Sequence, residues 1–149
     1  MSVQDPSSPS PGNSSPHNPT SSSTSGEPPF AQMLGIKERH GTDGVGTASM
    51  VIQEKHLQRA GVVQGGLIVT LADNALFLAV QSRLNPGERN VTIELKMNFL
   101  APAKEGELTA TARVISLGGR IIVANMEVLD QEETIIAAGL GTCMRVRPR

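Results

Sequence analysis

The stretch of sequence that decides the fold is Gly65-Gly66-Leu67-Ile68-Val69-Thr70-Leu71-Ala72-Asp73-Asn74-Ala75-Leu76-Phe77-Leu78-Ala79-Val80. Two glycines open it, and the residues after them are apolar on almost every side of a helix, a pattern typical of a helix enclosed by other structure. Asp73 is the only ionisable side chain between Arg59 and Arg83. Burying a carboxylate is costly unless it is paired or used in chemistry. The stretch therefore predicts a central helix over 65–82 that contains one carboxylate, Asp73, with either a structural partner or a chemical role.

The composition separates a tail from a single domain. The chain has 149 residues, which suits one domain. Residues 1–28 are dominated by Ser, Pro, Asn, Thr and Gly and offer almost nothing to bury, so we expect a disordered tail there. Residues 29–149 have ordinary globular composition and are expected to form the domain. The formal net charge is −1 with no basic cluster, and the chain has no Trp or Tyr, which argues against a nucleic-acid partner.

Cysteine usage and hydropathy indicate the compartment. The single cysteine, Cys143, rules out an intramolecular disulfide, suits a reducing cytosol and is expected to be a small core residue. Residues 60–82 have about the length of a membrane span, but Gln64, Asp73 and Gln81 make them too polar. The N-terminus has neither a cationic start nor an apolar core, so it is no secretory signal. We expect a cytoplasmic protein without a membrane span, and the sequence predicts no metal site.

The segments on either side of the helix have strand patterns. Before it we expect a helical turn, a weakly extended segment, a β-rich run and a loop, at 30–34, 36–40, within 47–55 and at 56–63. The clearest strand follows the helix, where apolar residues alternate with polar ones and predict one buried face: Val91, Ile93, Leu95, Met97 and Phe99. Three more strands are expected over 108–114, 121–128 and 134–146.

The order of these elements predicts the architecture. The Gly118-Gly119 pair favours a tight hairpin, and consecutive hairpins imply an antiparallel meander. The apolar face of that sheet needs a partner, and the predicted helix is the only object large and apolar enough. The derived fold class is α+β, a sheet curled around one central helix. Gly139 and Gly141 in the last strand predict a bulge or a close approach.

Two features of the helix could carry chemistry. The first-turn N–H groups at Gly65 and Gly66 have no intrahelical partner, so they could bind an anion or the oxyanion of an acyl-transfer reaction. Alternatively, the glycines only permit a tight turn and close packing. Asp73 shares a stripe with other residues at helical spacing, namely Thr70, Asn74, Phe77 and Gln81. It could be a general base or a nucleophile in a cleft, or a structural carboxylate at a subunit contact.

Residues 63–75 resemble the HGG-x-x-x-T-L-x-D signature of hotdog-fold acyl-CoA thioesterases, of the phenylacetyl-CoA thioesterase type within the 4-hydroxybenzoyl-CoA thioesterase superfamily. Residues 91–103 resemble that family's next strand and its Pro turn. The similarity covers roughly residues 30–147. It implies a hotdog fold and hydrolysis of an acyl-CoA thioester to the free acid and CoA, with no cofactor.

The resemblance also implies a role for each matching residue. Asp73 matches the catalytic carboxylate, and Gly65 matches the glycine whose backbone N–H polarises the thioester carbonyl. Gln58 matches the amide that positions substrate or water, and Thr92 matches the hydroxyl that orients the attacking water. In the family the active site lies between subunits, with Gln58 and Gly65 from one and Asp73 from the other. A homodimer or homotetramer is therefore expected, which an exposed edge strand also favours.

In the family, CoA is held near the helix entrance, by the turn after the second strand and by a later glycine hairpin. The matching residues are Gln64, Gly66, Phe99, Leu100, Ala101, Pro102, Lys104, Gly118, Gly119 and Arg120. The sequence does not identify the acyl group, although Phe77, Leu78, Gln81 and the residues near Phe30 and Met33 are candidates to line its pocket.

One departure from the signature keeps other functions open. Gln64 stands where the family has histidine. His40 and His56 are candidates to compensate, but both are expected to be surface residues. A non-catalytic acyl-CoA-binding protein is therefore an alternative to the hydrolase. A hotdog dehydratase or hydratase is a third, although those enzymes usually rely on a His–Asp or His–Glu pair that is not evident here.

Overall fold

The structure, a computed structural model, describes residues 26–148. The predicted tail over 1–28 therefore lies almost entirely outside the described residues. The elements follow the expected order, with one turn of 3-10 helix at Glu54–His56 before the central helix. They are α1 (Pro29–Leu34), β1 (Ile36–Thr42), β2 (Val45–Val51), α2 (Gly65–Gln81), β3 (Arg89–Phe99), β4 (Glu107–Leu117), β5 (Ile121–Leu129) and β6 (Ile135–Val146).

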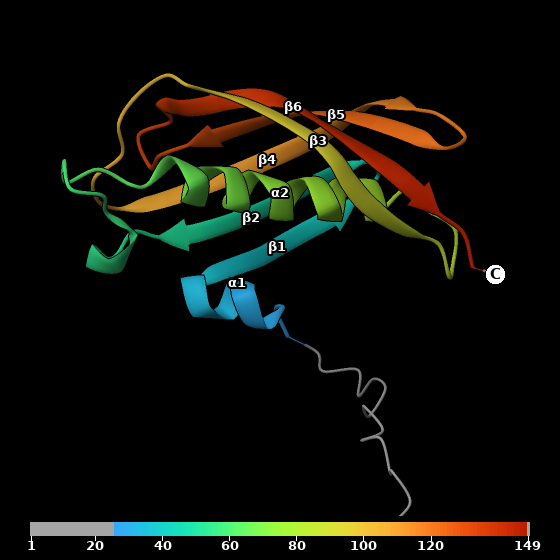
Figure 1. The fold of residues 1–149 in the computed structure, drawn as a ribbon, viewed down its shortest axis with the longest axis horizontal. Coiled ribbons are helices and arrows are strands. Elements are labelled where there is room, and N and C mark those ends of the chain that lie inside the picture. Colours follow the sequence, from blue (N-terminus) through green and yellow to red (C-terminus); the bar gives the residue numbers. More distant parts are fainter. Residues whose placement is uncertain (1–25, 149) are drawn as a thin grey trace, which may run out of the picture.

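The six strands form one antiparallel sheet in the order β1-β2-β4-β5-β6-β3. Strands β4, β5 and β6 follow one another as a meander, as predicted. Strand β3 differs from that prediction, because it pairs with β6 at the far edge of the sheet instead of with β4. Figure 1 shows α2 running between the two edge strands, β1 and β3. The α+β architecture with one central helix is confirmed.

The core lies between α2 and the inner face of the sheet. The helix buries Leu71, Leu76 and Val80 completely against inward residues of the sheet such as Leu108 and Ile122. Two strand glycines allow the helix to come close. A Cβ at Gly46 would overlap the backbone of Ala75 and Ala79, and a Cβ at Gly141 would overlap the side chain of Leu76. The close approach predicted for the last strand is therefore confirmed at Gly141.

The predicted buried face of β3 is wrong in part. Val91, Ile93 and Phe99 are about half exposed, at 49%, 52% and 55%. The pairing register with β6 shifts between Thr92 and Glu94, which marks a β-bulge. Because one extra residue inverts the faces of a strand, Asn90 and Thr92 point inward before the bulge, and Leu95 and Met97 pack on the core after it.

Two smaller predictions have opposite outcomes. Cys143 is fully buried, so the prediction of a core cysteine is confirmed. The prediction that both histidines lie on the surface is right for His40, which is exposed, and wrong for His56, which is only 2% exposed. Among the described residues, no helix is both long and apolar enough to cross a bilayer.

Candidate active site

One stripe of α2 is not covered by the sheet of its own chain. Thr70, Asp73, Asn74 and Gln81 are partly exposed and Phe77 is 41% exposed. The sheet instead covers the opposite side of the helix, which runs between the edge strands β1 and β3 (Figure 1). Asp73, Asn74 and Phe77 of this stripe line a pocket together with residues of both edge strands.

A hydrogen bond joins the carboxylate of this stripe to β3. The hydroxyl of Thr92 donates to Oδ1 of Asp73 at 2.8 Å. The bulge in β3 places Thr92 on the helix-facing side, so this contact depends on it. Behind the pair, Sγ of Cys143 lies 3.9 Å from the Thr92 hydroxyl. Burial, together with the Asp73 charge, raises the pKa of Cys143 despite the opposing contact with Thr92, which favours the neutral thiol.

Asp73 and Thr92 share a pocket of about 240 Å³, which we call the Asp73 pocket. Sequence reasoning missed two of its polar residues, Glu38 on β1 and Asn90 on β3. Glu38 lies two residues after Ile36, which the structure buries completely, and Asn90 lies two residues before the predicted site residue Thr92. Strand periodicity places each on the same face as that neighbour. The lining residues are Pro28, Glu38, Asp73, Asn74, Phe77, Asn90 and Thr92.

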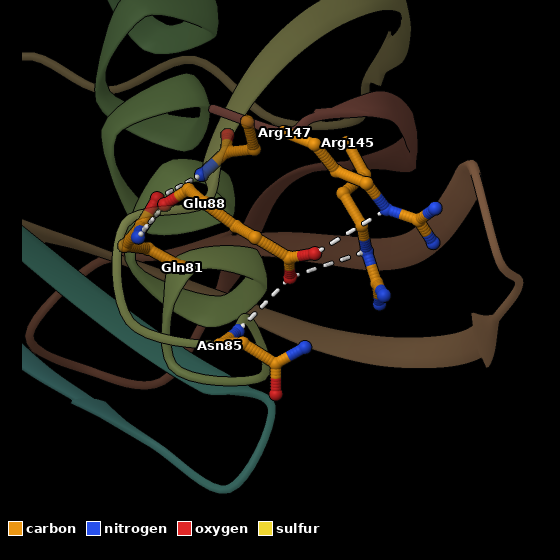
Figure 2. A network of polar contacts seen from close by, with 6 residues as sticks. Gln81, Asn85, Glu88, Arg145 and Arg147 are labelled. Atoms are coloured by element: carbon orange, nitrogen blue, oxygen red, sulfur yellow. Dashed lines mark hydrogen bonds and ion pairs between the residues drawn. The ribbon is translucent and has the colours of Figure 1, made fainter. Parts of the chain in front are cut away.

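A buried carboxylate anchors the end of α2 and the start of β3 to the end of β6. Glu88 is 8% exposed and pairs with the Nε atoms of Arg145 at 3.8 Å and Arg147 at 3.5 Å. Its carboxylate also accepts the backbone N–H of Asn85 at 3.0 Å, and its carbonyl accepts Nε2 of Gln81 at 3.0 Å (Figure 2). Leaving a buried charge without its partner is strongly destabilising. The contacts of Glu88 therefore hold the end of α2, the start of β3 and the end of β6 in one arrangement.

The network continues into the Asp73 pocket through Asn90. Its side-chain nitrogen donates to Oε1 of Gln81 at 3.0 Å and to the carbonyl of Phe77 at 3.4 Å. The side-chain oxygen of Asn90 is buried and has no hydrogen-bond partner among the described residues. The first residues of β3 are thereby held against the exposed stripe of α2, which keeps Thr92 within reach of Asp73.

The helix entrance forms a second pocket of about 380 Å³, the Gly65 pocket. The N–H of Val63 donates to the carbonyl of Ala103 at 2.8 Å, which brings the segment after β3 beside the entrance. A Cβ at Gly65 would lie 3.1 Å from the Phe99 ring, so the ring rests on the bare glycine. The lining residues are Gln58, Val62, Val63, Gly65, Ile68, Phe99, Leu100, Ala101, Pro102 and Ala103.

The backbone N–H groups at this entrance are available. Within the described part of the chain, no hydrogen bond engages the N–H of Gly65 or Gly66. Gln64 precedes them as the N-cap residue, is exposed, and makes no side-chain cap hydrogen bond. A helix N-terminus with free N–H groups favours a negatively charged oxygen.

His56 cannot replace the histidine that the signature has at Gln64. Its Nδ1 accepts the backbone N–H of Gln53 at 3.0 Å, and its carbonyl accepts the N–H of Gln64 at 2.9 Å. Burial, with the nearby charge of Lys55, lowers the pKa of His56 and favours the neutral ring. The residue supports the loop before the helix and does not line the Gly65 pocket.

The structure separates the remaining predicted site residues. Gly119 and Arg120 line a third pocket, of about 590 Å³, together with residues 144–147 at the end of β6. The N–H of Gly118 closes the hairpin by donating to the carbonyl of Ile121 at 2.9 Å. Gln64, Gly66 and Lys104 are adjacent to the Gly65 pocket in sequence but do not line it.

The two principal pockets lie apart on the same helix. Asp73 lies eight positions after Gly65, which corresponds to about 12 Å along the helix axis. Gln58 and Gly65 line one pocket, whereas Asp73 and Thr92 line the other. One chain therefore cannot bring both groups to the same reacting atom. Among residues 26–148, no group of three or more His, Cys, Asp or Glu side chains is arranged to hold a metal ion.

Comparisons with known proteins identify the family. The model of the thioesterase superfamily matches residues 60–137. A protein of Archaeoglobus fulgidus that bears an esterase name is 36% identical over 117 residues, spanning 78% of this chain and 71% of its own. The 1,4-dihydroxy-2-naphthoyl-CoA hydrolase of Listeria monocytogenes is 28% identical over 109 residues, spanning 69% of this chain and 89% of its own.

Solved structures agree with the family. The PaaI protein from the phenylacetic acid degradation operon of E. coli superposes with a TM-score of 0.73 at 29% identity, covering 78% of this chain and 83% of its own. The sheet curled around one helix is thus the hotdog fold of these proteins, and the class of activity that the relatives support is hydrolysis of a thioester. The chain belongs to the thioesterase superfamily.

Proposed function

We propose that this protein hydrolyses acyl-CoA thioesters to the free acid and CoA, at a site that two copies of the chain complete. The observation that carries the proposal is the contact between Asp73 and Thr92 on the uncovered stripe of α2, at 2.8 Å. It places an oriented carboxylate at the mouth of a pocket. The choice of CoA as the thiol rests on the resemblance of residues 63–75 and 91–103 to acyl-CoA thioesterases, and on the name of the Listeria relative.

The reaction needs a base, an oxyanion site and water. The Asp73 carboxylate takes a proton from a water molecule while the water oxygen bonds to the thioester carbon. The negative charge that develops on the carbonyl oxygen is stabilised by the free N–H of Gly65, with the amide of Gln58 close to the same pocket. When the C–S bond breaks, the proton on Asp73 passes to the CoA sulfur. No cofactor enters this sequence.

Thr92 has a more specific part than the one expected from the family. Its hydroxyl donates a hydrogen bond to Asp73, so Thr92 orients the carboxylate directly. Its oxygen lone pairs can still accept a hydrogen bond from the attacking water. Asp73 could also attack the thioester carbon itself and form an anhydride that water then opens. Hydrolysis in ¹⁸O-labelled water under single-turnover conditions separates the two routes. Direct attack by water puts one ¹⁸O into the acid, whereas an anhydride opened at its Asp73 carbon puts the ¹⁸O into Asp73 and releases an acid without label.

A second copy would supply the missing half of each site. Within the described chain, β3 has a neighbour on one side only, so the unpaired N–H and C=O groups of this edge can pair with the same strand of another copy. We propose that Gln58 and Gly65 of one copy then face Asp73 and Thr92 of the other. CoA would lie along Phe99–Pro102, with Gln64, Gly66, Lys104 and the 118–120 hairpin as further candidate contacts.

The experiment that tests this function is a thiol-release assay with a panel of acyl-CoAs, comparing the wild-type protein with Asp73→Asn. The variant should lose about 10²–10⁴-fold in kcat/KM, the usual share of a general base. Asp43→Asn is the matched control, because it makes the same change in the exposed turn between β1 and β2, where Asn tolerates the left-handed backbone. Full activity in Asp73→Asn would contradict the assignment. Saturable CoA-ester binding without turnover by the wild type would instead favour the acyl-CoA-binding alternative.

A further inference from the structure

Glu38 is a second carboxyl group in the Asp73 pocket. It lies on β1 two residues after the fully buried Ile36, and it shares the strand face that is turned toward α2. Glu38 is partly buried and lines the pocket together with Asp73 and Phe77. Between described residues, no hydrogen bond or ion pair engages its carboxylate. A side chain of this kind has no evident structural use on the inner face of a sheet.

The surroundings of Glu38 disfavour further negative charge. Burial and the neighbouring Glu27 raise the pKa of the Glu38 carboxyl. Asp73 adds another carboxylate to the same pocket. The two cations that flank Glu38 in the strand pair elsewhere, Lys37 with Glu27 at 4.0 Å and Arg39 with Glu107 at 3.5 Å. None of the described residues that line the pocket is Lys, Arg or His. A bound anion would meet two carboxyl groups and no cation.

The hydrogen-bonding groups of the pocket also disfavour an anionic ligand. The Thr92 hydroxyl donates its hydrogen bond to Asp73. The side-chain nitrogen of Asn90 donates to the carbonyl of Phe77 and to the side-chain oxygen of Gln81. What is left unpaired on Asn90 is its buried oxygen, an acceptor. A carboxylate needs donors to replace its hydration, because burying it unpaired costs far more than burying an uncharged group. The side-chain nitrogen of Asn74 donates to the carbonyl of Thr70 at 2.8 Å, which leaves one of its two N–H groups. The pocket therefore lacks a cation and offers few donors to an anionic ligand.

We infer that Glu38 sets the charge selectivity of the site: the pocket accepts acyl groups with an uncharged end and rejects acyl groups that end in a carboxylate. This inference rests on the proposed function, in which the thioester carbon lies beside Asp73 and the acyl group extends into the Asp73 pocket. Two like charges about 6 Å apart in a partly screened site repel enough to change an equilibrium constant by about a hundredfold, and solvent screening reduces this. We expect at least about a tenfold effect on kcat/KM.

The test compares two acyl-CoAs of equal carbon number, hexanoyl-CoA and its carboxyl-terminated counterpart adipoyl-CoA, at about pH 8, which is well above the ordinary pKa of a carboxyl group. Glu38→Gln keeps the size of the side chain and removes its charge. Glu127→Gln is the matched control, because Glu127 is exposed on β5 and alternates with the inward Met126 and Val128. For each protein the measured quantity is the ratio of kcat/KM for hexanoyl-CoA to that for adipoyl-CoA.

The wild type should prefer hexanoyl-CoA, and Glu38→Gln should lower the ratio at least about tenfold, mainly by raising kcat/KM for adipoyl-CoA. Glu127→Gln should leave the ratio at the wild-type value. An equal ratio in wild type and Glu38→Gln, with hexanoyl-CoA still hydrolysed, would overturn the inference and leave the proposed function standing. If the wild type hydrolyses no acyl-CoA of the panel, the proposed function fails and the inference fails with it.

Discussion

The hydroxyl of Thr92 on β3 donates a hydrogen bond of 2.8 Å to Oδ1 of Asp73 on α2. The two residues belong to different elements, and only the bulge after Thr92 turns its side chain toward the helix. A single contact thus joins an edge strand, the central helix and the carboxylate to which the chemistry is assigned.

Thr92→Val should reduce kcat/KM by about 10–150-fold, because a hydrogen bond to a charged group contributes about 1.5–3 kcal/mol. Valine keeps the branched shape that a strand favours and removes only the hydroxyl. Thr92→Ser restores the hydroxyl and should recover most of the activity, measured by steady-state thiol release. Equal activity in the valine and serine variants would show that the hydroxyl does not orient Asp73.

Gly46→Ala should destabilise the fold by about 1–3 kcal/mol or more, because its methyl group would overlap the backbone of Ala75 and Ala79 in α2. Urea denaturation measures the loss. Gly119→Ala is a suitable stability control, since a Cβ there meets no atom within 4 Å. A Gly46→Ala protein as stable as the wild type would mean that α2 does not lie this close to β2.

Stability should fall when the pH is lowered below about 6.5, because burial and Lys55 lower the pKa of His56 in the folded chain. The sign follows from proton binding: between the folded and unfolded pKa values the unfolded chain binds the extra proton, so acid favours unfolding. Denaturant titrations across this range should show the slope in the wild type and in His40→Gln, which alters an exposed histidine. The slope should be lost in His56→Gln, and its persistence there would assign it to other groups.

The sequence was sufficient to predict local structure where its signals are local. The glycine pair and the apolar run defined α2 within one residue, since the predicted 65–82 became Gly65–Gln81. The hairpin at Gly118-Gly119 and the close approach at Gly141 were also predicted, because each depends on the conformational or steric freedom of glycine at one position. The polar stripe around Asp73 followed from helical spacing alone.

The errors arose where distant segments decide the structure. The alternation from Val91 to Phe99 has no mark of a bulge, and the bulge is stabilised by what Thr92 reaches on α2. The pairing of β3 with β6 joins segments far apart in the sequence, and the rule that consecutive strands form hairpins does not predict it. His56 ends a single 3-10 turn in a segment without apolar periodicity, so nothing in its own segment signals its burial. Glu38 was missed because nothing in its own segment shows that β1 faces the Asp73 stripe.

The central claim is that each active site is shared between two copies. It is tested most directly by co-expressing Asp73→Asn with the double variant Gln58→Ala/Gly65→Ala, each carrying a different affinity tag, and isolating the pairs that carry both tags. Each variant alone should have strongly reduced thiol release. The double variant loses the Gln58 amide, and its new Cβ at position 65 would lie 3.1 Å from the Phe99 ring and narrow the Gly65 pocket, although the backbone N–H remains. In the mixed pair one of the two sites combines intact Gln58 and Gly65 from one copy with intact Asp73 from the other, so the account predicts about half of the wild-type activity. A mixed pair as inactive as both parents would contradict it, because it would mean that each chain needs all three residues in its own site.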